Sequence, residues 1–136
     1  MKYLFRTVRK YPLTTLAVIA VWYLSFFTPP KTKLDNVAFI DKWIHMVMYG
    51  GTCAVLWAEY LARHRRIASP ARLALTVWAA PLMMSGTIEL LQEYCTGGRR
   101  SGDWLDLAAN ATGVTLAALI GILAARFRSK GGTGCA

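Results

Sequence analysis

The chain has 136 residues, of which 55% are hydrophobic and 17% charged, and its sixteen Lys and Arg outnumber seven Asp and Glu to give a net charge of +9. One domain is expected at this length, and so apolar a composition excludes a disordered chain and an ordinary soluble domain. The mean hydropathy of +0.35 points to the lipid bilayer as the solvent. The basic excess suggests either nucleic acid or membrane topology, so the positions of the charges must decide.

Four apolar stretches follow one another along the chain, at 11–27, 43–61, 73–91 and 104–125. A helix crosses the hydrocarbon core with about 20 mostly apolar residues, and each stretch reaches that length when its aromatic ends lie in the interface. The sequence therefore predicts an all-α membrane protein in which four transmembrane helices form an antiparallel bundle.

The first stretch also allows a signal peptide, because the residues before it are basic, but no small-x-small cleavage site follows it. Pro29 and Pro30 lack amide hydrogens and should end this helix. We expect residues 1–128 to form a single domain and the glycine-rich segment 129–136 to be a disordered tail.

The distribution of charge predicts the orientation of the bundle. One side has eleven basic residues and one acidic residue, which gives +10, whereas the other has five basic and six acidic residues, which gives −1. Basic residues gather on the cytoplasmic side, so both termini are predicted to be cytoplasmic, an N-in/C-in topology. The single acidic residue on that side, Glu59, is expected to pair with Arg63 one turn on. The basic excess is therefore topological, and a nucleic-acid partner is rejected.

Polar residues at the outer ends of the second, third and fourth stretches recur every three or four positions, which places them on one face of each helix. They are Asp41, His45 and Tyr49, then Glu89 and Gln92, then Asp103, Asp106 and Asn110. Small residues continue the last stripe at Gly113, Ala117 and Gly121, and small residues face neighbouring helices in lipid. An ionisable group near the bilayer centre costs roughly 2.5–3.5 kcal/mol, so we expect these faces to line one outward-facing polar pocket.

Each of these residues also has a structural interpretation. Asp41, Asp103 or Asp106 could serve merely as a helix cap, because the carboxylate of an acid in the first turn accepts hydrogen bonds from backbone amides that are otherwise unpaired. Asn110 could serve as a hydrogen bond that joins two helices. The combination of His45 and Glu89 is harder to explain in this way, because burying it costs desolvation that two apolar residues would avoid.

The segments Asp41-Lys42-x-x-His45-x-x-x-Tyr49, Glu89-x-x-Gln92, Arg100 and Asp106-x-x-x-Asn110-x-x-Gly113 resemble the VanZ family of small bacterial membrane proteins, over about residues 35–125. The resemblance implies a multi-pass protein of the bacterial cytoplasmic (inner) membrane with a cell-envelope function. The family's named member gives low-level antibiotic resistance, to the glycopeptide teicoplanin, without substituting the cell-wall precursor.

One part of the pattern departs from the family. The family's proline and glycine before the arginine stand here as Gly97 and Gly98, and two arginines follow. The spacing to Asp106 favours Arg100 over Arg99 as the counterpart. Between Thr96 and Gly102 this loop is basic and rich in glycine, so it could hold an anion such as a phosphate.

The first functional hypothesis is an enzyme at the outer leaflet that acts on a lipid-linked or phosphate-bearing envelope substrate. His45 or Glu89 would be the general base, and Asp41 or Asp106 would orient it. The residues expected to bind the substrate are Tyr49, Gln92, Arg99, Arg100, Asp103 and Asn110. A variant uses a divalent metal ion, because three carboxylates and one histidine suit a hard cation. The spacing matches no recognised metal signature, and no cofactor is identified.

Two other hypotheses use the same pocket without chemistry. A binding protein would recognise membrane lipids, a lipid-linked cell-wall precursor or a lipoglycopeptide without turnover. A proton-coupled transporter component would need more than these four helices for alternating access, which a homo-oligomer would supply.

Overall fold

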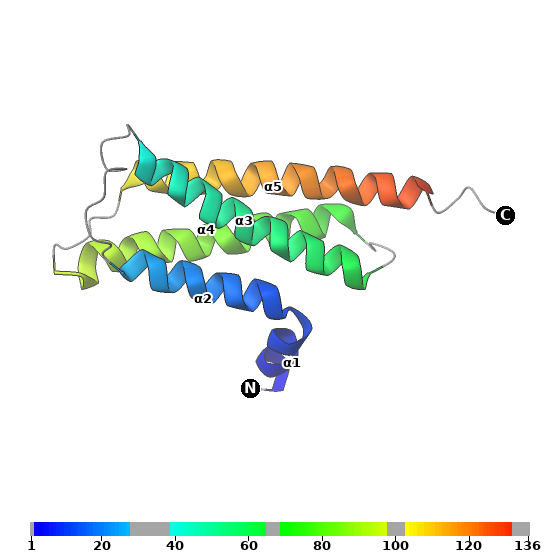
Figure 1. Cartoon of the computed structure of the whole chain (residues 1–136), viewed down its shortest axis with the longest axis horizontal. Coiled ribbons are helices and arrows are strands. Elements are labelled where there is room, and N and C mark those ends of the chain that lie inside the picture. Colours follow the sequence, from blue (N-terminus) through cyan, green and yellow to red (C-terminus); the bar gives the residue numbers. More distant parts are fainter. Residues whose placement is uncertain (1, 28–38, 65–68, 98–102, 132–136) are drawn as a thin grey trace.

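The computed structural model describes residues 2–27, 39–64, 69–97 and 103–131. Within these ranges the protein is all-helical, with five helices and no strand (Figure 1). They are α1 (Lys2–Lys10), α2 (Pro12–Phe26), α3 (Ile40–Arg63), α4 (Pro70–Cys95) and α5 (Trp104–Gly131). The prediction of an all-α fold is confirmed, and α2 to α5 correspond to the four apolar stretches.

Two boundaries differ from those expected. The basic segment before the first stretch forms the separate helix α1, which joins α2 through Tyr11. Pro12 is the first residue of α2, a position that needs no amide hydrogen. Helix α5 continues to Gly131, three residues into the expected tail, and residues 132–136 lie outside the described ranges.

The four long helices run in alternating directions, as Figure 1 shows. Helices α3 and α5 form the most extensive contact, while α2 packs on α3 and α4 packs on α5. The first residues of α2 and α4 and the last residues of α3 and α5 lie at the same end as α1. The opposite end gathers the polar residues that the sequence singles out, and we call it the outer end.

Glycine allows the close contact between α3 and α5. A methyl group built on Gly113 would overlap the carbonyl oxygen of Met46, and one built on Gly50 would lie 3.0 Å from the Gly113 carbonyl oxygen. About two turns below Gly113, a methyl group on Gly121 would overlap the Trp57 ring. The predicted small-residue face of the last helix therefore does face protein, with Gly113, Ala117 and Gly121 all buried against α3.

The start of α2 is held by an acid from α3. Both carboxylate oxygens of Glu59, which is only 7% exposed, accept hydrogen bonds from this helix start. The backbone amides of Leu13 and Thr14 donate over 3.1 and 2.9 Å, and the Thr14 hydroxyl donates over 2.7 Å. The predicted partner of Glu59, Arg63, adds electrostatic attraction. Glu59 is therefore a helix cap supplied by a neighbouring helix.

The molecule places polar side chains inside and large apolar side chains outside. Ten polar or charged side chains are buried in the described ranges, while Leu116, Leu119, Ile120 and Leu123 of α5 are each more than half exposed. Residues Trp104–Arg128 of α5 form the one described helix that is long and apolar enough to cross a membrane, and α2 is apolar but shorter.

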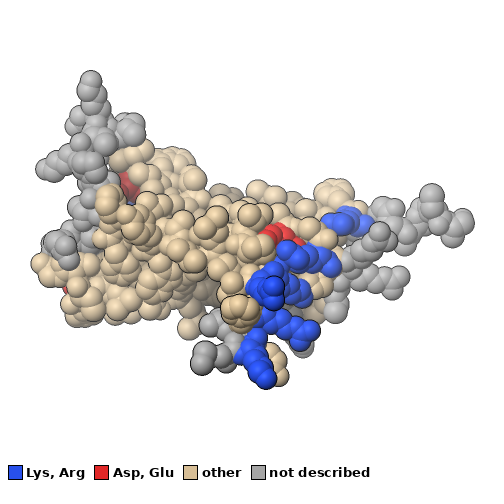
Figure 2. Space-filling model, turned by 60° about the horizontal axis from the view of Figure 1, so that its bottom comes forward, with Lys and Arg blue, Asp and Glu red and all other residues tan. Residues whose placement is uncertain are grey.

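Charge is also distributed unevenly. Figure 2 shows Lys and Arg gathered at the α1 end of the molecule. The described basic residues of this end are Lys2, Arg6, Arg9, Lys10, Arg63, Arg126 and Arg128. At the outer end, Lys42 of α3 is the one described Lys or Arg, and it lies beside acidic side chains.

Candidate active site at the outer end

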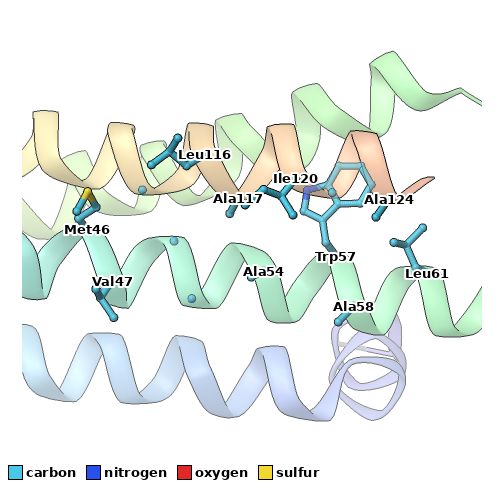
Figure 3. Close-up of a pocket in the computed structure, with 14 residues that line it drawn as sticks. Met46, Val47, Ala54, Trp57, Ala58, Leu61, Leu116, Ala117, Ile120 and Ala124 are labelled. Carbon is cyan, nitrogen blue, oxygen red and sulfur yellow. The ribbon is translucent and has the colours of Figure 1, made fainter. Parts of the chain in front are cut away.

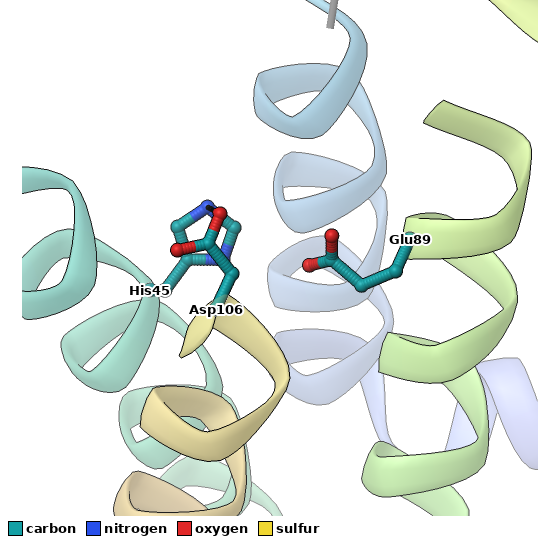
Figure 4. A group of neighbouring side chains, drawn as sticks. All are labelled: His45, Glu89 and Asp106. Carbon is teal, nitrogen blue, oxygen red and sulfur yellow. Dashed lines mark ion pairs between the residues drawn. The ribbon is translucent and has the colours of Figure 1, made fainter. Parts of the chain in front are cut away.

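Three ionisable side chains from three helices meet at the outer end. They are His45 of α3, Glu89 of α4 and Asp106 of α5, and one ligating atom from each lies within 4.8 Å of the other two (Figure 4). We call them the polar cluster. Each residue is more than nine-tenths buried, and His45 Nε2 lies 3.8 Å from Asp106 Oδ2. The convergence expected from the spacing of the polar residues is present.

Lys42 joins two acids beside the cluster. Its Nζ lies 2.5 Å from Asp106 Oδ1 and 2.7 Å from Asp103 Oδ2. The hydrogen bond from Lys42, and after it the amide of Leu105, lower the pKa of Asp103 from its ordinary value. The cluster therefore adjoins one cation that is already shared by two carboxylates.

Asp103 also fixes the beginning of α5. Its Oδ1 accepts a hydrogen bond of 2.9 Å from the amide of Leu105, which is the geometry of a helix N-cap. Its own amide donates to Glu89 Oε2 over 3.2 Å. The capping interpretation of Asp103 is confirmed, and through Asp103 the first turn of α5 is tied to Glu89 of α4.

A second polar layer lies below the cluster and connects the helices. Asn110 Nδ2 donates to Ser85 Oγ over 2.7 Å, with both side chains fully buried. Gln92 Nε2 donates to the Ser25 carbonyl oxygen of α2, also over 2.7 Å. The Tyr49 hydroxyl, almost completely buried, has no hydrogen-bond partner within the described residues. Of the predicted substrate residues, Gln92 and Asn110 are thus engaged in holding the bundle together, whereas the Tyr49 hydroxyl is buried without a hydrogen bond to the described part of the chain.

Three buried atoms of the polar cluster, each exposing less than 1 Å², have no hydrogen-bond partner among the described residues: Glu89 Oε1, His45 Nδ1 and Asp106 Oδ1. Asp106 Oδ1 is ion-paired with Lys42, which leaves Glu89 Oε1 and His45 Nδ1 without a polar partner in the described ranges. Buried polar atoms in proteins are nearly always bonded to protein or water, so such atoms mark a place where a ligand can bind. A hollow of about 130 Å³ between α4 and α5 is lined by Glu89 and Asp103 and leads to the cluster from outside.

A groove follows the contact between α3 and α5 from the outer end downward. It holds about 520 Å³, and all fourteen lining residues are apolar or glycine (Figure 3). It begins at Met46, the residue after His45, and reaches Leu61, a distance of roughly 22 Å at the helical rise of 1.5 Å per residue. The polar cluster and an extended apolar groove are therefore neighbours.

The remaining predicted site residues lie elsewhere. Asp41 is exposed in the first turn of α3 and is not a member of the cluster. Arg99 and Arg100 lie outside the described residues. The sequence analysis assigned no role to Lys42. Its position three residues before His45 on the same helix could have indicated that it lies beside the site. Ser25 was also missed, because its contribution to Gln92 is a backbone carbonyl, which no side-chain pattern reveals.

No family model, no curated protein and no solved structure matches this chain. The likeness to VanZ proteins therefore depends on the motif residues alone. In the structure the nine described motif residues all occupy the outer half of the bundle: Asp41, Lys42, His45, Tyr49, Glu89, Gln92, Asp106, Asn110 and Gly113.

Proposed function

We propose that this chain is a VanZ-like integral protein of the bacterial cytoplasmic membrane, in which α2 to α5 span the bilayer and both termini are cytoplasmic. Three observations support the proposal: the polar interior, the apolar exterior of α5, and the basic residues at the α1 end. Basic residues mark the cytoplasmic side, so the polar cluster lies toward the outer leaflet.

Within this setting we propose that the protein acts on a lipid-linked, phosphate-bearing substrate of the cell envelope. The observation that carries the proposal is a buried and incompletely hydrogen-bonded cluster beside an apolar groove. A lipid chain would occupy the groove, which exceeds the roughly 15 Å depth of one leaflet. The headgroup would then lie next to His45.

The roles of the cluster residues follow from their contacts. Asp106 Oδ2 faces the His45 ring and would orient it. Glu89 Oε1, which has no hydrogen-bond partner in the described part of the chain, would accept a proton from the attacking group. Lys42 and the loop arginine, Arg100 or Arg99, would attract the phosphate. Asp41, exposed at the rim, would contact the headgroup rather than the reacting atoms.

The test is turnover by purified protein in liposomes that contain isoprenoid-linked cell-wall precursors, with products identified by mass spectrometry. Glu89→Gln should abolish product formation while helix content by circular dichroism stays unchanged. Glu93→Gln, an exposed acid one turn further along α4, should behave like the wild type. Expression of the wild type in a susceptible host should also raise its tolerance to teicoplanin.

A non-catalytic binding protein is the other outcome of this test. Wild type that retains the precursor without converting it, and Glu89→Gln that loses it, would replace the enzyme by a binding function. A proton-coupled transporter receives less support. Between the cluster and the α1 end, the described core is mainly apolar, with Cys53, Trp57, Val77 and Val114, and its buried polar residues Thr52 and Glu59 are separated by about two turns of α3.

A further inference from the structure

We infer that His45, Glu89 and Asp106 together bind one divalent cation of the kind that prefers oxygen and imidazole ligands, such as Mn²⁺. The inference rests on the proposed function and deepens it: the cation supplies the charge that a phosphate headgroup needs at this site, and while it is bound Glu89 and His45 act as its ligands instead of as proton acceptors. Binding of the cation itself follows from the arrangement of the three side chains and can be measured without any substrate.

The distances suit a shared ion. Ligands bound to one such cation at about 2.0–2.3 Å lie up to roughly 4.6 Å apart when they are on opposite sides of it. His45 Nε2 and Asp106 Oδ2 are 3.8 Å apart, and the Glu89 oxygen lies within 4.8 Å of both partners. The 4.8 Å limit exceeds the span of roughly 4.6 Å by about 0.2 Å, a gap that a small rotation of the Glu89 side chain would close. Each ligand comes from a different helix, so the ion would join α3, α4 and α5 (Figure 4).

The hydrogen bonds within the cluster point to a missing partner. Glu89 is 8% exposed, its carboxylate is directed toward the other two side chains in Figure 4, and its Oε1 has no donor among the described residues. Its second oxygen, Oε2, accepts from the Asp103 amide. A carboxylate oxygen that is buried without a donor is costly, and a bound cation satisfies it.

The charges around the cluster lead to the same conclusion. Glu89, Asp103 and Asp106 carry three negative charges when ionised, and the basic side chains that the described residues place beside them are Lys42 and His45. With a neutral imidazole, Lys42 leaves two of these negative charges uncompensated, and the buried carboxylates of Glu89 and Asp106 would repel a phosphate. One divalent cation balances them, and such ions hold substrate phosphates through one or two carboxylates.

The experiment is titration of the full-length protein in detergent with Mn²⁺, followed by electron paramagnetic resonance. One equivalent of bound Mn²⁺ is expected, with coupling to an imidazole nitrogen that disappears in His45→Ala. Glu89→Gln and Asp106→Asn should weaken binding about tenfold or more, since even the loss of a second-shell partner costs 10–100-fold. Glu93→Gln is the matched control and should bind like the wild type.

Absence of stoichiometric binding by folded wild type, or equal affinity in Glu89→Gln, would overturn the inference. The two proposals also fail separately. Mn²⁺ binding without conversion of any lipid-linked precursor would sink the enzyme and leave the metal site in place. Conversion that continues at full rate in the presence of a chelator would remove the metal site and leave the enzyme.

Discussion

Lys42 shows how a single side chain can determine the electrostatics of a buried site. Its ammonium contacts Asp103 and Asp106, one of which caps α5 while the other faces His45. The side chain of Asp106 is 10% exposed, so without this contact its charge would have little water to stabilise it. The lysine therefore couples the position of α3 to the start of α5.

Replacing Lys42 with Met should destabilise the protein, because Asp106 would keep a buried charge with no cation beside it. We expect a loss of about 2 kcal/mol, below the 3–5 kcal/mol of a fully buried pair because the lysine side chain is 23% exposed. Thermal unfolding in detergent measures it. Adding Asp106→Asn to Lys42→Met should recover part of the loss, whereas additive losses would show that the pair is not coupled.

The sequence predicted the members of the site better than their individual roles. Spacing by three and four residues was sufficient to bring His45, Glu89 and Asp106 together, because each lies on the face of its helix that carries small or polar residues. The same spacing wrongly predicted that Asp41 would join the polar cluster. Two steps of four residues rotate a helix by roughly 80°, so Asp41 and Tyr49 point in different directions even though each is one step from His45.

At the scale of the elements, hydropathy located α2 to α5 but not α1. Long apolar stretches have a length set by the bilayer, so their approximate limits can be read from composition. Helix α1 is short, and four of its residues Lys2–Lys10 are basic. Such a composition is typical of a charged segment that precedes a membrane helix, so it did not predict a helix of its own. The cap of α2 by Glu59 depends on how α3 passes α2, and no local pattern contains that information.

Removing this cap should loosen the start of α2. Glu59→Ala leaves the amides of Leu13 and Thr14 without their acceptors, and we expect a loss of about 1–2 kcal/mol. Hydrogen exchange at these two amides, in detergent, should become faster than at the middle of α2. Glu59→Gln keeps one oxygen acceptor and should have a smaller effect. Unchanged exchange in Glu59→Ala would show that the cap contributes nothing.

The contact between α3 and α5 makes a matched pair of glycine substitutions informative. Gly113→Ala forces a methyl group against the Met46 carbonyl and should cost about 1–3 kcal/mol, seen as a lower unfolding temperature. Gly51→Ala is the control, because no atom lies within 4 Å of the added methyl group. It should be neutral or stabilise α3 by about 0.5–1 kcal/mol. Equal behaviour of the two variants would contradict the close packing.

At the scale of the whole molecule, the distribution of polar and apolar surface and the gradient of basic charge both support the proposed orientation in the membrane. Burying leucine between helices gains no hydrophobic free energy in lipid, so the contacts between membrane helices are made by small and polar residues. The exposed leucines and isoleucine of α5 and its buried Asp106 and Asn110 fit that setting. In the proposed topology the basic α1 end faces the cytoplasm.

The native cysteines test this orientation. Cys95, at the end of α4 near the outer end, is exposed, and Cys53 is fully buried. A membrane-impermeant maleimide added to intact spheroplasts should label Cys135→Ser through Cys95 without permeabilisation. The variant Cys95→Ser should be labelled only after permeabilisation, through Cys135. The reverse pattern would place the polar cluster on the cytoplasmic side.

The polar cluster also has a consequence for biosynthesis. Lys42 and His45 leave the ribosome well before Asp103 and Asp106, so in the proposed membrane α3 enters the bilayer before its charge partners exist. An unpaired ionisable group costs roughly 2.5–3.5 kcal/mol at the bilayer centre and less near a helix end, and the arrival of α5 offsets this smaller cost for Lys42 and His45. We therefore expect a nascent chain stopped before α5 to be held poorly by the membrane and degraded, so that the last helix made secures those inserted before it.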